Sequence, residues 1–278
     1  MAILLGVFVA ASFGTGDFLG GSASRRVPTV VVLATAQCCA LVGAGVMVAV
    51  FAGDATARDL ILGFGAGALN VVALGCLYAG LAAGRMGIVA PLTAVIAACI
   101  PVVWGIANGE SLPTLAFVGV VLAIGAGGLV AHERDEATEE PATRAILLAI
   151  AAGTLFGSSL VAYSETSHAS GAWPLLAGRV VAVVLAVGAA LVVARRLSIA
   201  RPERSMAIGA GMLDVAGTGL LLVAVRDGLI ALVVPVAALG PAFTVIWAWL
   251  VLHEPIGRLQ LVGLVAALAG LTMITAAA

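Results

Sequence analysis

Long apolar stretches separated by short polar turns fill the whole chain. Ten stretches fit the pattern, at about residues 2–22, 28–51, 59–82, 86–108, 112–131, 145–165, 172–194, 205–225, 228–252 and 256–277. A helix needs about 20 residues, each rising about 1.5 Å, to cross roughly 30 Å of hydrocarbon. The stretches are continuously apolar and lack the alternation that strands of a membrane barrel show. The pattern therefore predicts an all-α membrane protein with ten transmembrane helices.

The first five stretches recur in the last five. Three kinds of residue return at one constant offset: Pro91, Glu110 and Gly119 as Pro235, Glu254 and Gly263. Many membrane transporters are built from such duplications, with the copies inverted about a pseudo-two-fold axis in the membrane plane. We therefore expect two inverted five-helix repeats, residues 1–131 and 145–278.

Residues 132–144 form the only markedly polar stretch and lie where one copy ends and the next begins. Dense mixed charge of this kind usually stays solvated, so we interpret the segment as a linker. A regulatory or partner-binding segment is the alternative.

Composition supports a membrane environment. The chain is 63% hydrophobic and 10% charged, and its mean hydropathy is +1.21. Soluble domains carry about 25% charged residues, so an ordinary globular protein is excluded. A net charge of −1 without a basic patch gives no support for nucleic-acid binding.

No motif in the chain indicates a catalytic or metal centre. The four cysteines all lie within apolar stretches: Cys38, Cys39, Cys76 and Cys99. The sequence has no CxxC pair, no HExxH, no GxSxG and no P-loop. We therefore expect no metal, no cofactor and no enzymatic activity.

Charged residues inside apolar stretches are the main functional signal. Arg179 and Asp214 lie within the seventh and eighth stretches, where each costs about 2.5 to 3.5 kcal/mol on insertion scales. When the copies are aligned, Arg179 falls opposite Gln37 and Asp214 opposite Asn70. An inverted repeat brings such pairs to its axis near the bilayer midplane. We therefore predict a substrate site lined by these four residues.

A structural role is the alternative for each of these residues. Arg179 and Asp214 would also suit a buried ion pair that locks two helices, with the two amides making interhelical hydrogen bonds. Asp17 is a further candidate, for ion coupling or a secondary site. Its counterpart is Leu160, and its proximity to Arg25 and Arg26 favours a structural position close to the interface.

Four prolines interrupt the predicted fourth and ninth helices: Pro91, Pro101, Pro235 and Pro241. Each deletes a backbone hydrogen bond and permits a kink. These two helices are our candidates for gating elements.

Several segments resemble the EamA family of the drug/metabolite transporter superfamily. Residues 252–264 (LHEPIGRLQLVGL) resemble that family's Gly-Glu-Pro turn and the glycine-containing helix after it. Residues 108–112 (NGESL) form the parallel turn of the first copy, and residues 84–91 (GRMGIVAP) resemble the family's entry into its fourth helix. Residues 12–21 (SFGTGDFLGG) look like a variant found in bacterial members.

This resemblance covers essentially the whole chain and implies a transporter of small metabolites. Members often export amino acids or related compounds through a central cavity that opens alternately to each side. Coupling to protons is one option within the family, and Asp214 would then be the candidate carrier. A multidrug or lipophilic cation exporter is the alternative cargo reading. A non-transporting scaffold or a membrane enzyme is the alternative of another class.

The resemblance also implies a multi-pass protein of the cell membrane, with a small-molecule substrate and the lipid bilayer as its partners. The fused repeats make a monomer sufficient. All 13 basic residues are arginine, which points to a GC-rich bacterial genome.

Charge and resemblance disagree about orientation. The turns after odd-numbered stretches hold most arginines: Arg25, Arg26, Arg85, Arg134, Arg144, Arg195, Arg196, Arg201, Arg204 and Arg258. The other turns hold Arg58 and Arg226. The positive-inside rule therefore places both termini outside, whereas the family resemblance implies termini in the cytoplasm.

Overall fold

The computed structural model describes residues 2–109, 114–132, 139–226, 236–237, 239–254 and 257–277. Within these ranges the chain is helical and contains no strand. The helices are α1 (Ala2–Ser24), α2 (Thr29–Val50), α3 (Ala57–Ala83), α4 (Met86–Ala107), α5 (Thr114–His132), α6 (Glu139–Ser164), η1 (His168–Ser170), α7 (Trp173–Ala189), η2 (Ala190–Ala194), α8 (Glu203–Arg226), α10 (Gly240–Leu252) and α11 (Arg258–Ala277). The prediction of an all-α architecture is confirmed.

The helices follow the predicted apolar stretches closely, with two differences. Helix α6 begins at Glu139, so residues 139–144 of the segment interpreted as a linker are helical. In the ninth predicted stretch, residues 228–252, residues 236–237 are helical and α10 begins at Gly240, whereas residues 228–235 and 238 lie outside the described residues.

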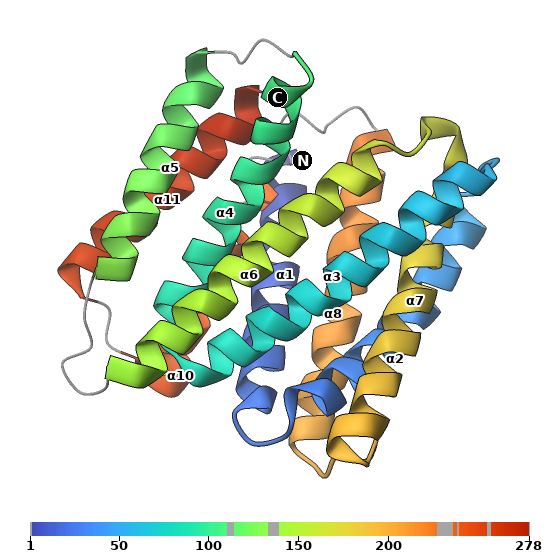
Figure 1. Ribbon diagram of the computed structural model, residues 1–278, viewed down its shortest axis with the longest axis horizontal. Helices are drawn as coiled ribbons and strands as arrows, with labels where there is room; N and C mark the ends of the chain where they lie inside the picture. Colours follow the sequence, from blue (N-terminus) through green and yellow to red (C-terminus); the bar gives the residue numbers. More distant parts are fainter. Residues whose placement is uncertain are drawn as a thin grey trace.

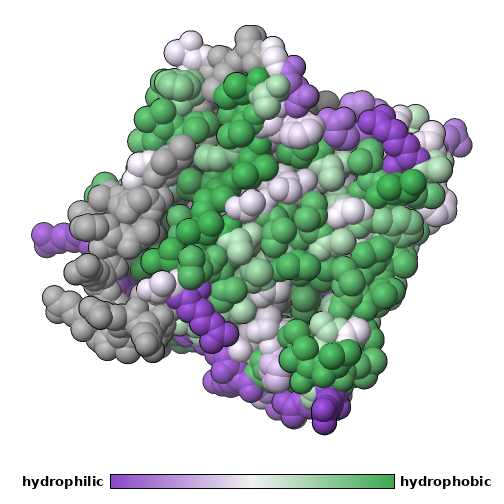
Figure 2. All heavy atoms as spheres, viewed as in Figure 1, coloured by the Kyte–Doolittle hydropathy of each residue, from purple (hydrophilic) through white to green (hydrophobic). Residues whose placement is uncertain are grey.

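The surface of the bundle is that of a membrane protein. Among the described residues, six helical segments are long and apolar enough to cross a bilayer, namely α1, α2, α3, α4, α6 and α7 continued by η2. Large apolar side chains face outward along them, and Val42, Ile61 and Val184 are 72%, 68% and 64% exposed. Figure 2 shows a broad apolar surface across the middle of one face, with hydrophilic residues gathered toward its ends. In water this surface would be costly, whereas in lipid it is the expected boundary.

The bundle pairs helices from the two halves of the chain. Helix α3 packs against α6 and α7, while α1 and α2 both pack against α8. Helices α5 and α11 lie side by side at one edge next to α4, and α2 and α7 meet at the opposite edge (Figure 1). The first and second halves are therefore interleaved and do not form two separate bundles.

Glycines set how closely these helices approach. A Cβ added to Gly67 of α3 would lie 2.2 Å from the Cα of Gly178 in α7. A Cβ added to Gly211 of α8 would lie 2.2 Å from the carbonyl oxygen of Ala36 in α2. No side chain larger than hydrogen fits at either crossing without movement of a backbone, as is usual where membrane helices pack through small residues. The two crossings join α3 to α7 and α8 to α2, and α2 in turn packs against α7.

The prolines take two different positions in the structure. Pro91 and Pro101 lie inside α4, as predicted. Pro241 does not interrupt a helix, because α10 begins at Gly240 and Pro241 occupies its first turn. Proline is well tolerated there, since the first turn has no intrahelical acceptor for its backbone N–H groups. Pro235 lies outside the described residues.

Candidate functional site

Three of the four predicted site residues meet inside the bundle, between α2, α7 and α8. The Arg179 guanidinium on α7 donates from Nη1 to Oε1 of Gln37 on α2, at 3.0 Å, and from Nη2 to Oδ2 of Asp214 on α8. Gln37 and Arg179 are buried, at 1% and 8% exposed, and the Asp214 side chain is 30% exposed. We call Gln37, Arg179 and Asp214 the central cluster.

The close helix crossings place this cluster. Arg179 follows Gly178, which packs against the backbone of Gly67, and Gln37 follows Ala36, which packs against Gly211. Tight backbone contacts at neighbouring positions fix how deep each helix lies, so the long side chain of Arg179 reaches both partners. A charged hydrogen bond in such a setting is stronger than a neutral one because the surrounding dielectric is low.

Asn70 does not join the cluster. It lies on α3 and is half-buried, and its side chain makes no hydrogen bond with any residue in the described part of the chain. The amide opposite Asp214 in the repeat alignment is therefore unpartnered among the described residues.

Asp17 lies on a packed face of α1. It is half-buried on α1, close enough to Asp214 for the two carboxylates to repel each other. Residues on both sides of Asp17 are packed between helices: Gly14 lies against Gly240 of α10, and Gly21 lies against α3. Asp17 lies between these two contacts along α1 and is therefore inside the bundle with them.

Two tyrosines near these charges were not predicted from the sequence. Tyr78 of α3 is 2% exposed and lies within electrostatic range of Asp17, Asp214 and Arg179. Its ring lies against Gly20 of α1, where an added Cβ would approach it to 2.1 Å. Tyr163 of α6 lies near the Arg179–Asp214 pair in the same way. A tyrosine within an apolar stretch does not stand out in the sequence, because its aromatic ring is expected there as a hydrophobic group.

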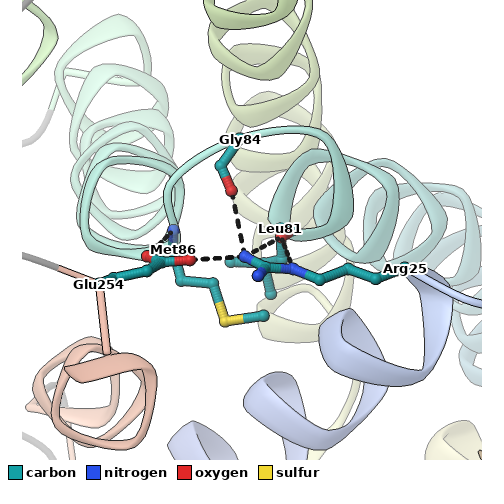
Figure 3. A network of polar contacts seen from close by, with 5 residues as sticks. All are labelled: Arg25, Leu81, Gly84, Met86 and Glu254. Carbon is teal, nitrogen blue, oxygen red and sulfur yellow. Dashed lines mark hydrogen bonds and ion pairs between the residues drawn. The ribbon is translucent and has the colours of Figure 1, made fainter. Parts of the chain in front are cut away.

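A second polar network lies at one end of the bundle (Figure 3). Arg25, in the turn after α1, contacts Oε1 of Glu254 at 2.6 Å and also donates to the carbonyl oxygens of Leu81 and Gly84. The other carboxylate oxygen, Oε2 of Glu254, accepts from the backbone N–H of Met86 at 2.9 Å. A carboxylate at the first turn of a helix is favourable because free N–H groups and the helix dipole meet it there.

This network joins both halves of the chain. Glu254 follows the last turn of α10, Met86 is the first residue of α4, and Arg25 follows α1. We call Arg25, Glu254 and the Met86 N–H the end tie. The sequence identified Glu254 as part of a family-like turn, but it gave no sign of the partner, which lies more than two hundred residues away along the chain.

Comparisons with known proteins agree with this picture. A family model described as the EamA-like transporter family matches residues 143–276. A solved structure titled "Crystal structure of protein" superposes with a TM-score of 0.66 at 14% identity, over 100% of this chain and 99% of the other. At that identity the likeness shows a shared fold alone. A comparison with curated proteins gave no match.

Proposed function

Because this chain belongs to the EamA-like transporter family through residues 143–276, we propose that it is a secondary transporter that moves a small organic metabolite across the cell membrane by alternating access. The observation that carries the proposal is the central cluster. Arg179, Asp214 and Gln37 meet inside an apolar bundle, where charged groups usually face a substrate or ion pathway.

Equivalent helix crossings support the inverted repeat on which this mechanism depends. The contact of Gly67 with Gly178 and the contact of Gly211 with Ala36 are exchanged by the same alignment of the two halves that pairs the polar residues. Each joins the third helix of one half to the second helix of the other. We propose residues 1–131 and 145–278 as the two repeats, related by an axis through the central cluster.

A second pair of crossings obeys the same relation. An added Cβ on Gly14 of α1 would meet Gly240 of α10, and one on Gly157 of α6 would meet Ala97 of α4. Two independent kinds of crossing are therefore matched between the halves, which supports ten helices in two inverted sets of five.

The end tie supports alternating access. It holds the end of α10 to the start of α4, and α4 contains two interior prolines at which it can bend. We propose that the end tie closes this end of the pathway and breaks when the protein opens there. Most arginines of the chain lie in turns at this end, so we place it in the cytoplasm. A phosphatase fused to the C-terminus would then be active outside the cell.

The proposed cargo is a small organic molecule. Export of an amino acid or related compound is the activity that the resemblance favours, and export of lipophilic cations is the alternative. A free Arg179 would favour a carboxylate, but Arg179 already binds Asp214 and Gln37. A transport assay in liposomes also distinguishes proton coupling from exchange as the energy source.

The proposal is tested with the purified protein in liposomes. We expect uptake or exchange of at least one compound from a panel of amino acids, organic acids and amines, and loss of that activity in Arg179→Gln and Asp214→Asn. Matched controls are Arg196→Gln and Asp54→Asn, which alter exposed residues of the same types outside the central cluster and should transport normally. Absence of transport for every class of compound would refute the proposal.

Stability measurements separate a substrate site from a packing pair. Arg179→Gln leaves Asp214 unpaired and should cost about 2 to 3 kcal/mol of stability, because an isolated buried charge is expensive. The double variant Arg179→Gln with Asp214→Asn gives the second half the same amides as the first and should recover most of this loss. If the pair only packs helices, the double variant will also regain transport. If it forms the site, the double variant stays inactive although it is stable.

A further inference from the structure

The charges at the middle of the bundle do not balance. Arg179 is paired with Asp214, and the opposite positions in the first half are neutral amides. Asp17 adds a second carboxylate, whose counterpart in the second half is Leu160. Within the described ranges, Asp17 makes no ion pair and no hydrogen bond. Among the described residues, this carboxyl group therefore has no partner.

The position of Asp17 makes this charge costly. The flanking positions Gly14 and Gly21 pack against α10 and α3, so the carboxylate lies between helices and not in a surface turn. Asp214 of α8 repels it. Arg179, the buried arginine among the described residues, is held by Asp214 and Gln37. An unpaired carboxylate in such surroundings needs a positive partner or a proton, because burial of an isolated charge is strongly unfavourable.

Tyr78 provides an independent sign of a missing partner. Its side chain is 2% exposed, and its hydroxyl makes no hydrogen bond to any described residue. It lies within electrostatic range of Asp17 and Asp214. A ring face and a free hydroxyl next to a carboxylate are the groups that bind an ammonium ion, by cation–π attraction and hydrogen bonding.

We propose that Asp17 and Tyr78 bind the protonated amino group of the substrate, so that the cargo is an organic amine without a carboxylate. This inference rests on the proposed transport function and names its substrate class. An amino acid would bring a carboxylate for which the described interior offers no free cation, since Arg179 is already neutralised. An organic acid would add a further negative charge beside Asp17. A protonated amine restores neutrality.

The test uses matched ligands and the full-length protein in detergent and in liposomes. Three carbon skeletons, hexyl, phenethyl and cyclohexyl, are each presented as a primary amine, an α-amino acid and a neutral amide. Binding is measured by calorimetry and transport by uptake into liposomes. We expect the amines to bind and be transported, and the amino acids and amides to bind about 30-fold or more weakly, as expected when a buried charge pair is lost.

Variants then identify the residue that holds the amine. Asp17→Asn should weaken amine binding about 30-fold or more, Asp17→Glu should retain it within about tenfold, and the surface control Asp54→Asn should leave it unchanged. Without ligand, Asp17→Asn should melt at a higher temperature than the wild type, because it removes an uncompensated buried charge. The wild-type preference among the three matched ligand types tests the inference without any variant.

The outcomes separate the two proposals. Transport of amino acids or organic acids in preference to amines, or full amine affinity in Asp17→Asn, would overturn the amine site and leave the transporter intact. If no ligand of any type is bound or transported by the wild-type protein, the proposed function itself fails and the amine site with it.

Discussion

The end tie predicts a specific response to the loss of one charge. Glu254→Gln keeps an oxygen that can accept from the Met86 N–H, but it removes the charge that Arg25 contacts at 2.6 Å. If the tie closes this end of the pathway, the variant should populate the open state more often while the rest of the fold is unchanged.

The size of the shift follows from the burial of the pair. The side chains of Arg25 and Glu254 are 29% and 16% exposed, so the contact is more sheltered than a surface ion pair, which is worth about 0 to 1 kcal/mol. A hydrogen bond to a charged group contributes about 1.5 to 3 kcal/mol. With discounting for the exposed fraction, about 1.5 to 2 kcal/mol is expected. That energy raises an open population by about ten- to thirtyfold.

Hydrogen exchange at the start of α4 measures this population directly. The Met86 amide bonds to Glu254 across the end tie, so its exchange should require the tie to open. Exchange of the peptide that spans this turn should be about ten- to thirtyfold faster in Glu254→Gln. The matched control is Glu203→Gln at the same end, which removes a contact of 3.4 Å with Arg26, a side chain that is 69% exposed. It should leave exchange at Met86 unchanged.

Two results would refute the reasoning. Unchanged exchange in Glu254→Gln would mean that the contact does not hold the end closed. Equal acceleration in Glu254→Gln and Glu203→Gln would mean that any charge lost at this end loosens the bundle. A double-mutant cycle with Arg25→Gln gives a further check, because two residues in direct contact should show a coupling energy of about 1 to 2 kcal/mol.

Two further predictions concern packing and the opposite end of the bundle. Gly67→Ala should lower stability by about 1 to 3 kcal/mol, because the new methyl group meets the backbone of Gly178. The control Gly65→Ala on the same helix meets nothing within 4 Å and should be neutral or stabilising, as thermal unfolding of both variants would show. Asp59→Asn should lower the melting temperature. The Asp59 carboxylate accepts from the backbone N–H of Thr56, the residue before α3, at 2.9 Å, and from the backbone N–H of Ser167, the residue before η1, at 2.8 Å. The control Asp54→Asn alters an exposed side chain and should have little effect on the melting temperature.

The helices were predictable because lipid imposes a simple rule on the sequence. A span must hide its backbone groups in a helix and present apolar side chains to hydrocarbon, so its length and composition identify it without knowledge of its neighbours. The same rule identified Arg179 and Asp214, because a charge within such a span is rare and costly. Repeat alignment then supplied Gln37, which the structure brings into contact with Arg179.

Features that depend on relative helix positions were not predictable. The partner of Glu254 could not be read from the sequence, because Arg25 resembles any other arginine of a polar turn. Alignment placed Asn70 opposite Asp214, yet equivalence under the repeat does not ensure contact, and Asn70 stays outside the central cluster. Pro241 fell in an apolar run, but its position in the first turn of α10 depends on where that helix begins.

The two halves of the chain are alike at the positions that pack helices together and differ at the polar positions. Positions that set helix distances are filled alike in both, with Gly67 and Gly178 at one crossing and Gly211 and Ala36 at its equivalent. The polar positions next to these crossings differ in charge between the halves, because a close backbone contact tolerates only small residues while the side chain beside it points into the bundle. A duplicated scaffold can therefore keep its geometry while its centre becomes asymmetric. That asymmetry leaves Asp17 without a counterpart, and if the proposed amine site is correct, it gives an incoming cation one preferred side of the proposed axis.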